Sequence, residues 1–135
     1  MRKPEQRFWD RARPQLLQAR WVERIENIVA DGMPDTVVLN PVNSLTRFVE
    51  FKAVEKWPVR ANTKVLGRRT GLRQTQLNWH LNWNRLGGKS GILIGIGPHE
   101  VVYLDGKHSE EVNDMTKEQM LRLGATSWEE ILRVI

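Results

Sequence analysis

The chain has 135 residues, 40% of them hydrophobic, so it can bury one hydrophobic core, and it shows neither a disordered half nor an internal repeat. It contains no cysteine, which excludes disulfides, thiol catalysis and cysteine zinc sites. No apolar run reaches the roughly 20 residues that a membrane span needs, and the N-terminus lacks the apolar core of a signal peptide. We therefore expect a cytoplasmic protein with no membrane partner.

The net charge of +5 is spread unevenly along the chain. Residues 1–24 hold seven Lys or Arg against three acids, and residues 47–89 hold ten against two, whereas residues 90–135 hold four against eight. Such a division is typical of a protein that binds a polyanion on one side. The acidic C-terminal third is therefore not expected to contact a nucleic acid.

The first elements predicted in chain order are a helix over residues 7–17 and a strand over residues 21–26. The strand follows from alternating side chains, with Val22, Arg24 and Glu26 on one side. Glu26 is then expected near the start of the next strand.

The next two strands, over residues 35–40 and 46–53, are close enough in sequence to form a hairpin. Successive side chains of a strand point to opposite faces, so Glu50 and Lys52 point the same way. Asp35 stands at the mouth of the first strand, just after a Gly-x-Pro turn that can splay the strand from its neighbour. Its carboxylate can therefore reach a metal ion held by Glu50.

This hairpin predicts a metal-dependent site at Asp35, Glu50 and Lys52. Two carboxylates and a lysine are the minimum needed to hold Mg²⁺ beside a phosphodiester and to activate a water. Each motif alone has an ordinary explanation, because Pro-Asp is a common turn and Glu-x-Lys on a strand is usually a solvated face. Their combination favours nuclease chemistry.

A helix is predicted over residues 72–86, with Thr70 as a possible cap and Gly87-Gly88 as its end. We interpret Gln76 as packing beside the hairpin, where it hydrogen-bonds Lys52 or a metal-bound water. The alternative is that Gln76 is a boundary residue at the edge of the core. Gln74, on a different face, is the competing candidate. The predicted buried stripe consists of Gln76, Trp79, Trp83 and Leu86.

The connection over residues 53–71 is too long for a plain link between a strand and a helix. It is basic, and we interpret it as a substrate-contacting loop that grips phosphates and orders on binding; the alternative is a solvated mobile loop. The expected nucleic-acid-binding residues are Arg60, Lys64, Arg68, Arg69 and Arg73.

The C-terminal third is expected to support the fold. Strands over residues 91–96 and 100–104 pair, and two capping boxes, Thr116-x-x-Gln119 and Ser127-x-x-Glu130, each begin a short helix. The pattern as a whole indicates an α/β protein with a mixed sheet flanked by helices in the order αβββαβ. One apolar face is expected to bury against the core or against a second copy: Trp128, Ile131, Leu132 and Ile135.

These motifs together resemble the PD-(D/E)xK nuclease superfamily, especially its small phage VRR-NUC-type and Holliday-junction-resolvase-like members. The resemblance implies a restriction-endonuclease-like domain over residues 1–135, with a core over 1–115 and a helical extension over 116–135. It also implies roles for the site residues. Asp35, Glu50 and the backbone carbonyl of Phe51 would bind the metal, Lys52 would orient or activate water, and Gln76 would support them.

Resolvase-like members carry an extra glutamate, for which this chain offers Glu5, Glu23 and Glu26, with Glu26 preferred. The implied activity is that of a Mg²⁺-dependent DNA endonuclease of the phage type, with Mn²⁺ able to substitute, acting in the host cytoplasm. The resemblance also implies branched DNA as the substrate and a homodimer as the assembly. The alternative is a non-catalytic nucleic-acid-binding module on the same scaffold. RNA as the substrate is left open because phosphate contacts carry no sequence information.

Overall fold

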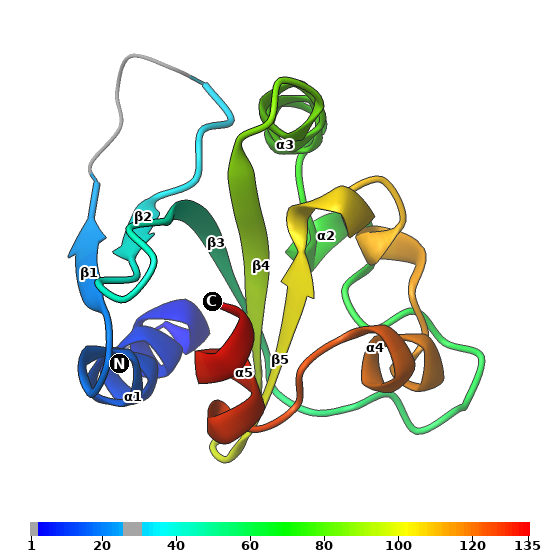
Figure 1. Cartoon of the computed structure of the whole chain (residues 1–135). Helices are drawn as coiled ribbons and strands as arrows, with labels where there is room; N and C mark the ends of the chain where they lie inside the picture. Colours follow the sequence, from blue (N-terminus) through cyan, green and yellow to red (C-terminus); the bar gives the residue numbers. More distant parts are fainter. Residues whose placement is uncertain (1–2, 26–30) are drawn as a thin grey trace.

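The computed structural model of the chain describes residues 3–25 and 31–135 and has a five-stranded sheet with helices on both sides (Figure 1). The order of elements is that predicted from the sequence, with a short extra helix before the central one. The elements are α1 (Pro4–Leu17), β1 (Trp21–Arg24), β2 (Thr36–Leu39), β3 (Thr46–Val54), α2 (Gly67–Thr70), α3 (Gln74–Arg85), β4 (Lys89–Ile96), β5 (Glu100–Asp105), the 3-10 turns η1 (Gly106–His108) and η2 (Val112–Asp114), α4 (Lys117–Leu123) and α5 (Trp128–Val134).

The sheet runs in the order β1-β2-β3-β4-β5, and only the pair β3–β4 is parallel. The predicted hairpin is confirmed, since Thr36 pairs with Val49 and Leu39 with Thr46 in an antiparallel register. The parallel pair needs a long crossover, which α2 and α3 supply. The predicted α/β class with a mixed sheet is therefore confirmed.

Two hydrophobic clusters cover the two faces of the sheet. One lies under α1 and α5 and contains Phe8, Val49, Phe51 and Leu93. The other lies under α2 and α4 and contains, among others, Ile92, Met120 of α4, and Val65 and Leu66, which precede α2. Within the described ranges, no helix is long and apolar enough to cross a bilayer.

The apolar face of α5 belongs to the core. Ile131 and Ile135 are fully buried in the cluster under α1, and Trp128 and Leu132 pack against it. Of the two occupants expected from the sequence, the structure therefore selects the core, because these side chains pack in the same cluster as Phe8 of α1 and the strand residues Val49 and Phe51.

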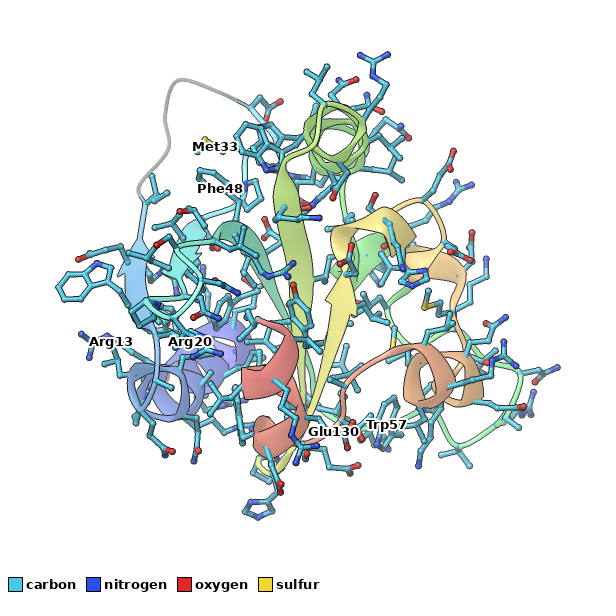
Figure 2. All side chains as sticks on the ribbon, viewed as in Figure 1. Arg13, Arg20, Met33, Phe48, Trp57 and Glu130 are labelled. Atoms are coloured by element: carbon cyan, nitrogen blue, oxygen red, sulfur yellow. The ribbon has the colours of Figure 1, made fainter. Side chains whose placement is uncertain are left out.

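The basic connection packs partly against the body of the protein, and its phosphate-binding role stays a prediction. The Val65 amide donates to the Met115 carbonyl at 3.0 Å, and Val65 and Leu66 are buried. Trp57 Nε1 donates to Glu100 at 2.8 Å. Figure 2 shows Trp57 at the end of the molecule opposite Phe48 and α3.

Helix α3 begins and packs differently from the prediction. It starts at Gln74 with Arg73 as its cap, while Thr70 ends α2 and its hydroxyl donates to the Leu66 carbonyl. Its buried side chains are Gln76 and His80, whereas Leu86 is 81% exposed. The predicted buried stripe is confirmed at Gln76 but wrong at Trp83 and Leu86, because the sheet beneath α3 presents polar side chains and the helix turns Gln76 and His80 toward them.

Candidate active site

The register of the hairpin brings the two predicted carboxylates to the same part of the sheet. Because Thr36 pairs with Val49, continuing the register by one residue puts Asp35 beside Glu50. The charge of Asp35 is therefore close enough to raise the pKa of Glu50. Pairing across a hairpin thus joins groups that are fifteen positions apart in the chain.

Glu50 is a buried carboxyl group without full charge compensation. Its residue is 5% exposed, and desolvation is the main cause that raises its pKa to about 8, followed by the charge of Asp35. Lys52 opposes this shift, but its Nζ lies 3.9 Å from Glu50 Oε2, too far for a strong hydrogen bond. Burial therefore outweighs the ion pair, and Glu50 is largely protonated at neutral pH when no cation is bound.

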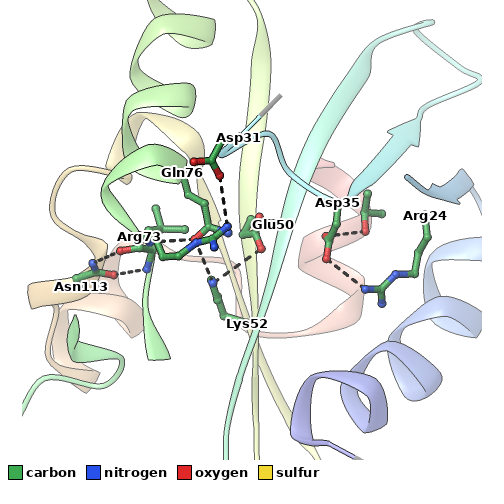
Figure 3. Close-up of polar contacts among 10 residues, drawn as sticks. Arg24, Asp31, Asp35, Glu50, Lys52, Arg73, Gln76 and Asn113 are labelled. Atoms are coloured by element: carbon green, nitrogen blue, oxygen red, sulfur yellow. Dashed lines mark hydrogen bonds and ion pairs between the residues drawn. The ribbon is translucent and has the colours of Figure 1, made fainter. Parts of the chain in front are cut away.

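Lys52 is held by Gln76, and Gln76 is held by the start of α3 (Figure 3). Gln76 Oε1 accepts a hydrogen bond from Lys52 Nζ at 3.3 Å and another from the Arg73 amide at 2.9 Å. The second bond is half of a capping box, so the first turn of the helix fixes the glutamine. The carbonyl oxygen of Gln76 therefore sets the position of the lysine ammonium group. Gln74, the competing candidate, is exposed and bonds Asn78.

Asp35 turns toward a different partner in this structure. Its Oδ2 accepts from Arg24 Nη2 at 3.2 Å, and its Oδ1 accepts from the Thr36 hydroxyl at 3.2 Å. Figure 3 shows Asp35 and Arg24 on the side of the site away from Gln76. Among the described residues no three His, Cys, Asp or Glu side chains form a ready metal cluster.

Gly32 seats the segment before Asp35 against α3. A Cβ atom there would lie 2.2 Å from the Thr75 carbonyl oxygen, and φ is +87°, where side chains are rarely accommodated. The neighbouring Asp31 pairs with Arg73 at 3.9 Å. The glycine of the predicted turn therefore allows close packing between the hairpin and the helix.

A buried polar network behind the site was missed by the sequence analysis. His80 Nδ1 lies 2.7 Å from Ser90 Oγ, and the side-chain Nδ2 of Asn84 donates to the same oxygen at 2.8 Å. Burial, then the charge of Lys52, lowers the pKa of His80 to about 4, so the ring is neutral. The spacing of Gln76, His80 and Asn84, four residues apart, was the available signal, but aromatic residues on the other face obscured it.

Asn113 is a second residue that the sequence did not reveal. Its side chain accepts from the Leu72 amide at 2.7 Å and donates to the Leu72 carbonyl at 2.8 Å. These two bonds fix the backbone just before α3, and hence the position of Gln76. No local pattern links residues 41 positions apart, so only the folded chain identifies this contact.

The five predicted nucleic-acid-binding residues are all exposed, and they extend from the site toward α4. Arg73 is nearest, because its charge lowers the pKa of Glu50, and Arg68 and Arg73 line a surface hollow of about 440 Å³. Lys64 pairs with Asp114 at 2.6 Å, whereas Arg60 lines a separate hollow with Lys117. Arg69 is exposed on α2.

The extra glutamate remains a prediction. Glu26, the preferred residue, lies outside the described residues. Glu5 and Glu23 are both exposed, and Glu5 is close enough for its charge to raise the pKa of Glu50. On this observation Glu5 is the stronger of the two described candidates.

The donor set fits a hard divalent cation. Two carboxylates lie at neighbouring positions of the hairpin, and the buried one, Glu50, has a raised pKa because Lys52 compensates its charge only in part; a bound cation would supply the rest. Mg²⁺ takes one or two carboxylates together with water and substrate oxygens, so it needs no larger cluster. The site therefore matches magnesium better than zinc, which prefers nitrogen and sulfur ligands.

Comparison with known proteins shows the fold. The chain matches no family model, and no curated protein sequence is significantly similar to it. Among solved structures it resembles Hjc, a Holliday junction resolvase of the archaeal hyperthermophile Archaeoglobus fulgidus, with a TM-score of 0.64, 13% identity and coverage of 92% of this chain and 97% of the other. The chain therefore has the fold of this structure, a five-stranded mixed sheet flanked by helices.

A second structure supports the same conclusion. A VRR_NUC domain matches with a TM-score of 0.50 and 20% identity, covering 71% of this chain and 86% of the other. The predicted resemblance to resolvase-like and VRR-NUC-type nucleases is therefore confirmed for the fold. The roles of the individual site residues stay predictions.

Proposed function

We propose that this protein is a Mg²⁺-dependent DNA endonuclease that hydrolyses phosphodiester bonds, with branched DNA as its preferred substrate. The observation that carries the proposal is the buried Glu50 beside Asp35 and Lys52, on the fold of a Holliday junction resolvase. A buried carboxyl whose pKa is raised by desolvation and a like charge is typical of a functional site rather than of a solvated strand. Mn²⁺ is expected to substitute for Mg²⁺.

Asp35, Glu50 and the carbonyl of Phe51 would hold the metal. Bound there, it would supply Lewis-acid stabilisation of the phosphate and a water of lowered pKa. Binding requires that Glu50 release its proton and that Asp35 exchange Arg24 for the metal. The first step removes the proton that burial favours on Glu50, and the second breaks the hydrogen bond between Arg24 and Asp35.

Lys52 is the group proposed to contact the reacting atoms. Its ammonium is fixed by Gln76 and points along the same face as Glu50, so it can orient the attacking water or stabilise charge on the scissile phosphate. The arginines at α2 and the start of α3 would bind the phosphates on either side. Exposed cations give affinity without sequence specificity.

The test is a cleavage panel of four-way junction, flap, nicked, continuous duplex and single-stranded DNA with Mg²⁺ or Mn²⁺. An RNA duplex is added to separate the two nucleic acids. We expect Glu50→Gln and Lys52→Ala each to lower turnover about a hundredfold or more. DNA affinity measured in EDTA should change little for Lys52→Ala.

Two matched controls lie on the same segment. Glu55→Gln and Lys56→Ala change the same residue types at exposed positions just beyond the buried pair. Both should cleave as the wild type does. Full activity of Glu50→Gln would remove the nuclease assignment of this site, whereas tight binding without cleavage by the wild type would favour the non-catalytic module.

A further inference from the structure

The turn that ends α3 presents a leucine to solvent. Leu86 is 81% exposed, although it directly follows the helix and precedes two glycines. Leaving a leucine in water forgoes the stabilisation that burial would give, but single exposed leucines are common and need no explanation by themselves. The surroundings of Leu86 distinguish it.

The turn that carries Leu86 is rigid. The Gly88 amide donates to the Trp83 carbonyl at 2.9 Å, and Trp83 Nε1 donates to the Lys89 carbonyl at 3.0 Å. Gly87 has a φ of +94°, and a Cβ atom on Gly88 would lie 2.3 Å from the indole nitrogen. These contacts fix the backbone on both sides of Leu86, and its side chain protrudes from the turn into solvent.

An aromatic cluster connects this turn to β3, the strand that carries the site. Trp83 stacks on Trp79 with ring centroids 5.1 Å apart, and Phe48 contacts the two rings edge-on at 5.2 and 5.5 Å. Phe48 is two residues before Glu50 and shares its face of β3. Figure 2 shows Phe48 beside α3. Movement of the turn relative to Glu50 is therefore restricted.

The charge around Leu86 fits a polyanion. Arg85 and Lys89 are exposed on either side of it. The sequence between Glu55 and Glu100 holds eight Lys or Arg and no acid. An apolar side chain flanked by cations, with no acidic residue in its segment, suits DNA better than an ordinary protein partner.

The distance from the site follows from helix geometry. Leu86, the C-cap of α3, lies ten positions after Gln76, which contacts Lys52, and a rise of about 1.5 Å per residue gives about 15 Å. Along a DNA strand of about 3.4 Å per step, this corresponds to about four base pairs.

We propose that Leu86 is a DNA wedge, inserting between bases about four base pairs from the scissile phosphate while Arg85 and Lys89 bind the flanking phosphates. The inference rests on the proposed function, and it identifies the substrate class. Apolar wedges must unstack a base step, and this costs least where the stack is already interrupted. DNA with a branch or nick at that distance is therefore favoured over continuous duplex.

The test uses the full chain with Leu86→Ala, and Leu121→Ala as a control, because Leu121 is also exposed but lies on α4. A four-way junction and a continuous duplex carry 2-aminopurine at successive positions, so that unstacking raises fluorescence. With Glu50→Gln as the background, the DNA is expected to stay intact. We expect a fluorescence peak about four base pairs from the mapped cut, lost in Leu86→Ala and kept in Leu121→Ala.

Affinity gives a second readout. Leu86→Ala should lower the preference for junction over duplex about tenfold while leaving duplex binding and Mn²⁺ binding unchanged. An unchanged fluorescence peak and preference would overturn the wedge. A dimer that dissociates only in Leu86→Ala without DNA would overturn it too, because the leucine would then be an interface residue. If no DNA in the cleavage panel is cut, the proposed function fails, but the fluorescence scan still decides on Leu86.

Discussion

The two faces of β3 differ in what they contribute. On one face Val49 and Phe51 are at most 1% exposed and pack in the cluster under α1 and α5. On the other face Glu50 and Lys52 are almost as deeply buried, at 5% and 9%, but contact polar groups. Val49 and Phe51 therefore stabilise the fold. Glu50 and Lys52, which alternate with them along β3, are ionisable groups held in a low-dielectric environment.

The comparison shows how a costly site is retained. Burying an uncompensated carboxyl disfavours folding, whereas burying an aromatic ring favours it. The polar face is supported by Gln76 and by the network of His80, Asn84 and Ser90 on α3 and β4. Burial of the apolar face of β3 offsets the unfavourable free energy of burying Glu50.

The largest expected effect is on the apolar face. Phe51→Ala should lower the free energy of unfolding by about 3–5 kcal/mol, because it removes a ring that contacts both Phe8 and Trp9. Urea denaturation followed by tryptophan fluorescence measures it. A loss below about 1 kcal/mol would mean that the two faces contribute alike.

The next effect concerns Glu50 and pH. Its pKa of about 8 in the folded state lies above the ordinary value of 4.5, so the folded protein holds a proton that the unfolded chain has lost. Stability is therefore fully present below pH 4.5 and falls as pH rises toward 8, by up to about 1.4 kcal/mol per unit.

Glu50→Gln should remove that slope, because glutamine stays neutral. The variant should match the wild type near pH 4 and exceed its stability at pH 8 in metal-free buffer, as measured by denaturation at each pH. Glu55→Gln, the exposed control, should keep the wild-type slope. Equal slopes in wild type and Glu50→Gln would show that Glu50 is ionised throughout.

A smaller effect separates the cap of Gln76 from its contact with Lys52. Gln76→Ala removes the acceptor of both the Arg73 amide and Lys52, at a cost of about 1–2 kcal/mol. Gln119→Ala removes the equivalent cap of α4, in which Gln119 Oε1 accepts hydrogen bonds from the Thr116 amide and hydroxyl. The excess cost in Gln76→Ala measures the contact with the lysine, and equal costs for the two variants would leave Gln76 as a cap alone.

The smallest effect concerns Arg24, which competes with a metal for Asp35. The pair is exposed, with 42% and 34% of the side chains accessible, so it is worth about 0.2–1 kcal/mol. Arg24→Ala should therefore tighten Mn²⁺ binding up to about fivefold by calorimetry. Arg133→Ala breaks the comparably short pair with Glu129 on α5 and should leave metal binding unchanged. Weaker Mn²⁺ binding in Arg24→Ala would show that Arg24 supports the site rather than competing for it.

The sequence by itself determined the elements that depend on neighbours in the chain. Alternation along residues 46–54 put Glu50 and Lys52 on one face, and the short turn before it made the hairpin with Asp35. A capping box sets the start of α4 and the side chain of Ser127 caps α5, because in each case a side chain three residues away satisfies a free amide of the helix end. These patterns were sufficient to predict the fold.

The tertiary structure alone decided which partners those side chains meet. The predicted stripe on α3 fails at its C-terminal end. Gln76 hydrogen-bonds Lys52 and His80 hydrogen-bonds Ser90, and this orientation of the helix leaves Leu86 in solvent. Arg24 on Asp35 and Asn113 on Leu72 join distant segments, and a pattern read along the chain holds no information on such pairs. Local propensity acts between neighbours, whereas burial and the charges around Glu50 are set by every segment that packs there.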